Sequence, residues 1–338
     1  MILTRAPLRV SFFGGGSDLP AYYTKSPSGG VCLSTAIDKY MYIALIETPK
    51  KHVKLMYSEI EIVDNVDKIK HDIVRNALNH FSFKSGIEIG SFADIPTAGT
   101  GLGSSSTFTV ALMQGLHYLR HGRDMSPYKL SEEACNIEID MCGKSIGKQD
   151  QYASAYGGTN LFQFKADGDV DITPVETYLR PLNNNLMMFY TGKTRSANDI
   201  LAKQSKAMNE ESKFVIVDEM VKMTYEAYDH LMNDEIDNFG ALLDKTWSLK
   251  KQLANGISDA KFDSIYKSAM TAGALGGKLL GAGGGGYFLF YVPEDNQEAV
   301  AEAVGLERFD FTINAHGAEI VYDSETGGIE NEFYEEVL

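Results

Sequence analysis

The sequence has few cysteines and no long apolar run. Its 338 residues include three cysteines, Cys32, Cys135 and Cys142, which form no CxxC pair and leave one unmatched in any disulfide scheme. No apolar run reaches the roughly 18 residues that a membrane-spanning helix needs. The N-terminal segment has no charged region followed by a small-residue cleavage site, so no secretory signal is expected. These absences predict a cytoplasmic protein that does not engage a membrane.

Basic residues are also scarce. The chain has 31 lysines and arginines against 46 aspartates and glutamates, a net charge of −15. Proteins that bind nucleic acid or anionic membranes usually show the opposite balance, so both kinds of partner are disfavoured. The hydrophobic share of 44% and the charged share of 23% are ordinary for a globular protein, and the length suggests two domains.

Two familiar phosphate-binding loops are absent. The GKS at 143–145 and the GKT at 192–194 lack the upstream glycine of a Walker A loop, because Glu138 and Met187 stand at that position. The GAGGGG at 281–286 matches GxGxxG, but it follows a helical pattern and precedes a strand, which is the reverse of the dinucleotide-binding order. The sequence therefore predicts neither a P-loop nor a Rossmann domain.

Hydropathy patterns predict an α+β protein that is strand-rich first and helix-rich second. Strands are expected over residues 2–13, 31–48, 53–63, 86–93, 158–164, 170–175, 186–192, 287–292, 309–313 and 318–322. Helices are expected over 68–81, over 104–119, from Ser126 with Pro127 at the first helical position, almost continuously over 197–272, and near 294–304. The change of composition near 175–185 predicts an N-terminal domain at 1–180 and a C-terminal domain at 181–338.

Fourteen of the 32 glycines lie in three stretches, at 14–16, 99–103 and 273–286, each beside an apolar segment. In the second stretch three glycines leave backbone N–H groups unobstructed, three serines add donors, and the positive end of the following helix points into the loop. This pattern is typical of a phosphate cradle. A plain strand-to-helix turn with serine caps is the alternative that spacing alone leaves open.

Three motifs in this order resemble the GHMP kinases. They are APLRV through Asp18 at 6–18, PTAGTGLGSS at 96–105 and KLLGAGGGG at 278–286. The resemblance covers nearly the whole chain and implies ATP- and Mg²⁺-dependent phosphorylation of a small metabolite. It also implies a two-domain fold with a left-handed βαβ unit in the first domain, an exception to the usual handedness, and an active site between the domains. The ATP-binding residues that it implies are Pro96, Gly99, Gly101, Leu102, Gly103, Ser104, Ser105 and Ser106.

Two stretches, RVSFFGGGSDLPAYY and GKQDQYASAYGG, are most similar to the D-glycero-D-manno-heptose 7-phosphate kinases of that family. This likeness implies phosphorylation of the anomeric C1 hydroxyl to give the 1,7-bisphosphate, in the biosynthesis of nucleotide-activated heptose for capsule or lipopolysaccharide. A sugar-1-kinase for an unphosphorylated sugar such as L-fucose is the alternative. A protein of the same fold that binds nucleotide or sugar without turnover is a third reading.

The resemblance also suggests roles for single residues. It makes Asp150 the catalytic base, Arg9 its neighbour near the transferred phosphoryl group, and Asp18 a ligand of the sugar hydroxyls. Ser105 and Glu138 match the pair that holds Mg²⁺ through oxygen atoms. Without the resemblance, Asp150 would be interpreted as a turn aspartate, Arg9 as a solvated arginine and Glu138 as a half-exposed helix glutamate.

Further residues are expected at the sugar. Galactokinase-like relatives carry Glu-His where this chain has Gly15 and Gly16, which opens space at the substrate. Lys193 and Arg195 suit capture of a substrate phosphate, although a basic loop on an acidic protein can simply be solvated. The late glycine cluster at 281–286 is expected to pack its backbone closely beside the substrate and the first motif. Gly283 and Gly284 are expected among the substrate-binding residues. A homodimer is a further expectation.

Overall fold

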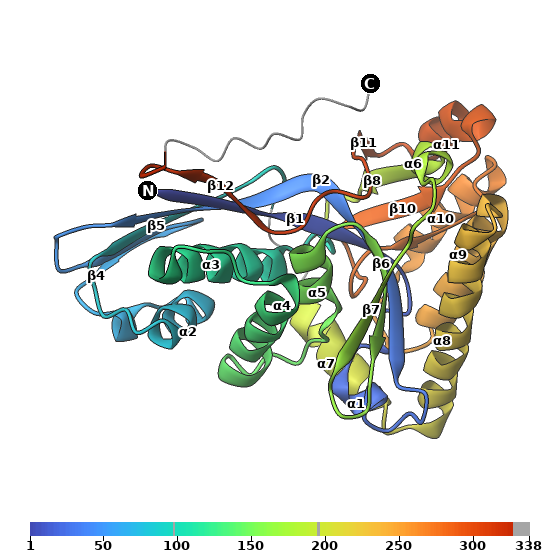
Figure 1. Ribbon diagram of the computed structural model, residues 1–338. Coiled ribbons are helices and arrows are strands. Elements are labelled where there is room, and N and C mark those ends of the chain that lie inside the picture. The colour runs from blue at the N-terminus through green and yellow to red at the C-terminus, as the bar shows by residue number, and fades with distance from the viewer. Residues whose placement is uncertain (97–98, 195–196, 327–338) are drawn as a thin grey trace.

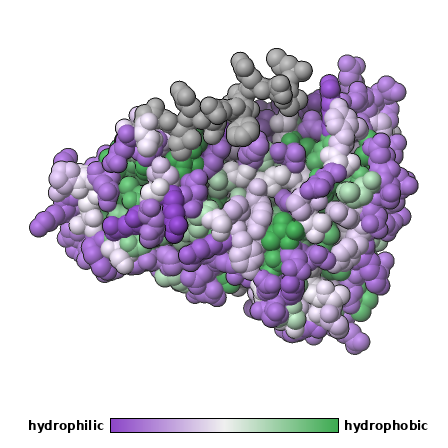
Figure 2. Space-filling view, in the orientation of Figure 1, coloured by the Kyte–Doolittle hydropathy of each residue, from purple (hydrophilic) through white to green (hydrophobic). Residues whose placement is uncertain are grey.

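The computed structural model describes residues 1–96, 99–194 and 197–326, except the side chains of residues 197 and 198 (Figure 1). Strands form two sheets, one of eight strands and one of four. The view in Figure 2 shows a mainly hydrophilic face with scattered apolar side chains. No helix of the described residues is long and apolar enough to span a bilayer.

The larger sheet has the path β12-β1-β2-β5-β3-β4, and β6 joins it by pairing with β2 and β7. Its strands are antiparallel except for the parallel pair of β3 and β5. Their bounds are β1 Ile2–Phe13, β2 Gly30–Glu47, β3 Val53–Met56, β4 Ile60–Val63, β5 Ile87–Ala93, β6 Thr159–Phe164, β7 Val170–Pro174 and β12 Glu319–Asp323.

Helices cover one side of this sheet (Figure 1). The 18-residue α3 packs on β1, β2 and α5, and it begins at the second glycine stretch because Gly103 adopts a left-handed conformation with φ 76°. The helix α4 runs on into a π-helical segment at Asn136–Met141. The bounds are α1 Pro20–Tyr23, α2 Asp72–His80, α3 Ser104–His121, α4 Pro127–Cys135 and α5 Gln149–Tyr156, with a 3₁₀ turn at Val66–Lys68.

The smaller sheet has the order β11-β8-β10-β9 and is antiparallel throughout. Its strands are β8 Leu186–Tyr190, β9 Gly276–Leu279, β10 Tyr287–Tyr291 and β11 Glu307–Phe309. The accompanying helices are α6 Arg180–Asn184, α7 Ala197–Ala207, α8 Glu211–Met232, α9 Ile236–Lys250, α10 Ala260–Thr271 and α11 Gln297–Val304, with a 3₁₀ turn at Glu294–Asn296.

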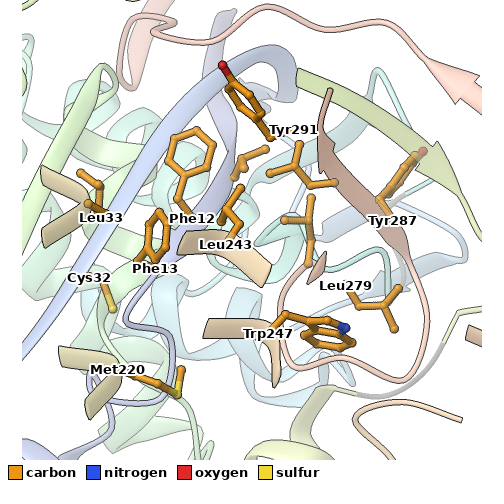
Figure 3. Close-up of a cluster of buried hydrophobic side chains, with 14 of the residues drawn as sticks. Phe12, Phe13, Cys32, Leu33, Met220, Leu243, Trp247, Leu279, Tyr287 and Tyr291 are labelled. Atoms are coloured by element: carbon orange, nitrogen blue, oxygen red, sulfur yellow. The ribbon is translucent and has the colours of Figure 1, made fainter. Parts of the chain in front are cut away.

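A shared apolar core joins the two sheets (Figure 3). Phe12 and Phe13 at the end of β1 meet the ring of Phe239 on α9 edge-on, with centroids 5.3 and 5.0 Å apart. The buried ammonium of Lys278 on β9 donates to the main-chain carbonyls of Ser11 and Phe12, both at 2.8 Å. The strand β1, which carries the first motif, is therefore fixed against the helical half of the molecule.

The α+β class and the change from strands to helices are confirmed, with local differences. The expected strand at 53–63 is the hairpin β3–β4, and the helical stretch at 197–272 is divided among α7, α8, α9 and α10. The last strand of the described residues, β12, returns to pair with β1 in the larger sheet. The domain division at residue 180 and the handedness of the βαβ unit stay predictions.

Candidate functional site

A cavity of about 730 Å³ lies where the three motifs meet. Its lining comes from the first motif, from the second motif with the start of α3, from residues 138–150 around α5, and from the end of α9 beside the third motif. The volume is in the range of small-molecule sites, and polar groups from segments far apart in sequence converge in it.

Asp150 is held by Arg9 at this cavity. The guanidinium donates through Nε to Oδ1 and through Nη2 to Oδ2, both at 2.8 Å, and its third nitrogen donates to the carbonyl of Gly101 at 2.7 Å. The Arg9 side chain is almost completely buried, whereas that of Asp150 is 27% exposed. The bidentate pair therefore fixes the orientation of a carboxylate that still has free lone pairs facing the cavity.

Asp18 is a second carboxylate of the cavity and is almost completely buried. It accepts from the backbone N–H of Gly16 at 2.9 Å and of Gln149 at 3.4 Å. Burial raises the pKa of Asp18, and the charge of Asp150 adds to this effect. A Cβ on Gly147 would lie 1.9 Å from Asp18 Oδ2, so glycine at that position makes room for the carboxyl group.

The start of α3 offers donors for an anion. Gly103 is the N-cap and supplies no side-chain cap, so the N–H groups of the first turn face the cavity that Ser104, Ser105 and Ser106 line. Gly101 and Gly103 have φ values of 80° and 76°, which glycine adopts without strain. This arrangement fits a phosphate group at the positive end of a helix.

Glu138 and Ser105 form an oxygen pair beside this cradle. The Ser105 hydroxyl donates to Glu138 Oε1 at 2.8 Å, and the Gln151 amide donates to Oε2 at 2.7 Å. Lys144 places its ammonium 3.1 Å from both Ser105 Oγ and Glu138 Oε1. Glu138 is fully buried and its charge is paired with that of Lys144, and its hard oxygen with that of Ser105 suits Mg²⁺, which takes only one or two protein ligands.

Aromatic side chains line another part of the cavity. Tyr57 meets His71 edge-on at 5.1 Å, His71 lies 5.2 Å from the ring of Phe108, and Phe92 lines the same space. Burial lowers the pKa of His71, which favours the neutral imidazole. A flat, largely apolar group such as a nucleobase fits this lining.

Comparison with protein families decides the identity. The model described as the GHMP kinases N terminal domain matches residues 67–158, and the GHMP kinases C terminal model matches residues 230–310, together about half of the chain. The chain belongs to the GHMP kinase family. Its members are kinases, so the chain is a phosphotransferase, and ATP is the phosphoryl donor that the family implies.

Three relatives illustrate the range within the family. A D-glycero-alpha-D-manno-heptose 7-phosphate kinase of Campylobacter jejuni is 26% identical over 94% of this chain and 97% of its own. An L-fucokinase/L-fucose-1-P guanylyltransferase of Bacteroides fragilis is 27% identical over 88% of this chain but only 35% of its own. A crystal structure of a D-glycero-D-manno-heptose 1-phosphate kinase from Bacteriodes thetaiotaomicron superposes on this chain with a TM-score of 0.76 and 22% sequence identity. The match covers 96% of this chain and 100% of that structure, which supports the fold.

Most of the predicted site residues of this GHMP kinase lie around one cavity. They are Arg9, Gly15, Gly16, Asp18, Pro96, Gly99, Gly101, Gly103, Ser104, Ser105, Ser106, Glu138 and Asp150. Leu102 does not line it: the side chain is buried in the core and the carbonyl accepts from the Arg9 N–H at 3.1 Å.

The late glycine cluster packs mainly against the second motif. A Cβ on Gly281 would lie 2.6 Å from the Cα of Gly101, and one on Gly101 would lie 2.4 Å from the carbonyl oxygen of Leu280. Gly283 and Gly284 lie against Ile257 and do not line the cavity, whereas Gly281 and Ala282 do. The expected close backbone packing is present, with the second motif as its partner.

The basic loop after β8 lies differently from the expectation. Lys193 pairs with Asp259 at 3.2 Å and lies over the ring of Phe262, half-exposed and outside the cavity lining. Arg195 lies outside the described residues.

Two lysines of the cavity are not singled out by the sequence. Lys144 and Lys250 both line it. Lys144 stands in the GKS that fails as a Walker motif. Lys250 ends a helix among several other lysines, and nothing in the local pattern distinguishes it from them.

Replacing Glu138 by glutamine should raise the Mg²⁺ concentration for half-maximal rate by about tenfold or more, because a neutral amide is a poorer ligand for a hard cation. Titration of Mg²⁺ at saturating ATP measures this. Glu133→Gln is the matched control, since Glu133 precedes it on α4 but pairs with His80 at 3.1 Å outside the cavity. Equal Mg²⁺ requirements in the two variants would exclude Glu138 as a ligand.

Proposed function

We propose that this GHMP kinase transfers the γ-phosphoryl group of ATP to the anomeric C1 hydroxyl of D-glycero-α-D-manno-heptose 7-phosphate and forms the 1,7-bisphosphate. The observation that carries the proposal is the Arg9–Asp150 pair, which holds a partly exposed carboxylate beside a phosphate cradle in one cavity. The choice of sugar rests on the likeness to the heptose 7-phosphate kinase over nearly the full length of both chains.

The residues of the cavity have distinct tasks in this reaction. Asp150 accepts the proton of the acceptor hydroxyl, and Arg9 holds the carboxylate in place. An anomeric hydroxyl is more acidic than an ordinary alcohol, so a carboxylate is basic enough. The N–H groups at the start of α3 donate to phosphate oxygens, and Asp18 accepts from sugar hydroxyls.

Metal and nucleotide are expected at neighbouring residues. Ser105 and Glu138 would hold Mg²⁺, which neutralises phosphate charge when it is bound. Residues 99–106 would hold the triphosphate, while Tyr57, His71 and Phe108 suit the base.

Two alternatives to a heptose 7-phosphate kinase are a kinase for an unphosphorylated sugar and a non-catalytic sensor. A kinase for an unphosphorylated sugar such as L-fucose is suggested by the fucokinase relative, which matches this chain at 27% identity. A non-catalytic sensor would not need a base and a metal pair, yet Asp150, Arg9, Ser105 and Glu138 all lie at this cavity. The arrangement favours turnover over sensing.

The cellular setting is part of the proposal. We place the enzyme in the cytoplasm, where ATP is available, in the formation of nucleotide-activated heptose for capsule or lipopolysaccharide, and a homodimer stays a prediction. Cys32 and Cys135 are buried free thiols, and burial raises their pKa values well above the ordinary range, which makes both thiols unreactive.

A comparison of acceptors tests the sugar. With saturating ATP and Mg²⁺, kcat/KM for the heptose 7-phosphate should exceed that for the same heptose without its phosphate, and that for L-fucose, by about tenfold or more. Such a ratio corresponds to one charge-assisted hydrogen bond to the phosphate. Equal values for the two heptoses would exclude recognition of the 7-phosphate, and a preference for L-fucose would establish the alternative.

A further inference from the structure

Lys250 brings a buried ammonium to the cavity. It is the last residue of α9, it is 4% exposed, and its Nζ donates to the carbonyl of Gly281 at 2.8 Å. An ammonium has three N–H donors, and burial without partners is costly for each of them. Beyond the bond to Gly281, the ammonium therefore has N–H donors left for a ligand in the cavity that Gly15, Asp18 and Asp150 also line.

The other long cationic side chains of the lining are already paired. Arg9 is held by Asp150, and Lys144 is held by Glu138. Lys250 forms no ion pair within the part of the chain that the structure describes. A ligand oxygen that enters the cavity thus meets in Lys250 a cation that is not neutralised by a direct carboxylate contact.

The first motif leaves space for this ammonium. A Cβ on Gly15 would lie 3.3 Å from Lys250 Nζ, so any side chain there would crowd it. The titratable groups that act on Lys250 are Asp18, Arg9 and Asp150 from the first motif and α5, the buried thiol of Cys32 on β2, and Lys278 on β9. Three of them surround the acceptor hydroxyl in the proposed reaction, which places the ammonium at the reacting end of the sugar.

We propose that Lys250 is a catalytic residue that donates a hydrogen bond to the acceptor oxygen as this oxygen attacks the γ-phosphorus. The inference rests on the proposed function. In the step the acceptor O–H bond breaks and its proton passes to Asp150, the new O–P bond forms, and the bond from the γ-phosphorus to the β–γ bridging oxygen breaks to release ADP. Negative charge that develops on the attacking oxygen is stabilised by a fixed cation at hydrogen-bond distance.

The proposal has a pH consequence. Burial lowers the pKa of Lys250 to about 8, against the opposing effect of Asp18. The charged form that the step requires is therefore present below pH 8 and is lost as the pH rises through that value. Arginine at this position would stay charged, because its guanidinium does not titrate in this range.

Steady-state kinetics with the heptose 7-phosphate provide the test. Lys250→Met should lower kcat/KM about 10- to 100-fold while the affinity for a non-hydrolysable ATP analogue stays within about twofold. The control is Lys245→Met, which removes an exposed lysine from the same helix and should leave kcat/KM unchanged. In wild type, kcat/KM should fall above pH 8, and in Lys250→Arg the residual activity should persist to higher pH.

The possible outcomes separate this proposal from the proposed function. If Lys250→Met and Lys245→Met have equal kcat/KM, or if Lys250→Arg keeps the wild-type alkaline limb, Lys250 has no such role although the kinase assignment stands. If wild type turns over neither the two heptoses nor L-fucose, both proposals fail. If Lys250→Met does not fold, as judged by circular dichroism and ATP-analogue binding, the pH dependence of kcat/KM in wild type and in Lys250→Arg tests the proposal. A wild-type alkaline limb that is unchanged in Lys250→Arg would exclude the role of Lys250.

Discussion

Replacing Asp150 by asparagine is expected to lower kcat at least about 100-fold while binding of an ATP analogue persists. Asparagine keeps the shape of the side chain, but its amide cannot accept the proton of the acceptor hydroxyl. It also replaces one of the two oxygens that Arg9 contacts at 2.8 Å with a nitrogen donor, so the bidentate pair is lost. The effect therefore combines a missing base with a less well fixed Arg9.

Rates at saturating sugar and ATP measure the loss, and ATP-analogue affinity shows that the cavity is intact. Asp140→Asn is a suitable control, because Asp140 is an exposed aspartate outside the cavity lining. An Asp150→Asn enzyme that retains wild-type kcat would remove Asp150 from its role as base.

Replacing Gly101 by alanine is expected to lower the free energy of unfolding by about 3 to 5 kcal/mol. The φ of 80° strains any other residue, and the new Cβ would lie 2.4 Å from the carbonyl oxygen of Leu280. Since backbone atoms of the second and third motifs are in contact here, the clash cannot be relieved by turning a side chain. Nucleotide affinity should fall as well, because the same loop forms the cradle.

Gly122→Ala separates conformational strain from crowding. Gly122 has φ 64°, but no heavy atom lies within 4 Å of the place that a Cβ would take, so alanine there should cost about 1 to 2 kcal/mol. Urea unfolding of both variants gives the comparison. Equal losses of stability would mean that the second and third motifs are not packed as described.

The meeting of the three glycine-containing motifs could be predicted because their order resembles that of the GHMP kinases, whose active site they form. Arg9 near the N-terminus and Asp150 on α5 gain a role as a pair. The depth of burial of Glu138 was not predictable, because its π-helical segment departs from the regular spacing by which a helix face is assigned. Likewise, only the folded chain shows that Lys193 turns to Asp259.

The elements that the sequence does not predict have misleading local composition. The helix α5 has polar residues at buried positions, among them Gln149, Gln151 and Ser154, so it lacks an apolar stripe. The strand β9 begins with two glycines, which are typical of turns, and here they allow the close approach of α9 and β10. Lys250 depends on that same approach, which brings the end of α9 to the cavity.

The position of the transferred phosphate tests the central claim most directly. Phosphorus-31 NMR of the heptose 7-phosphate after incubation with the enzyme, ATP and Mg²⁺ should show a new phosphate resonance coupled to the anomeric proton, with one ADP formed for each product molecule. Under the proposed function the C1 hydroxyl binds between Asp150 and the cradle at the start of α3, which border the same cavity. A new phosphate on any other carbon, or ADP formed without a phosphorylated sugar, would contradict the account.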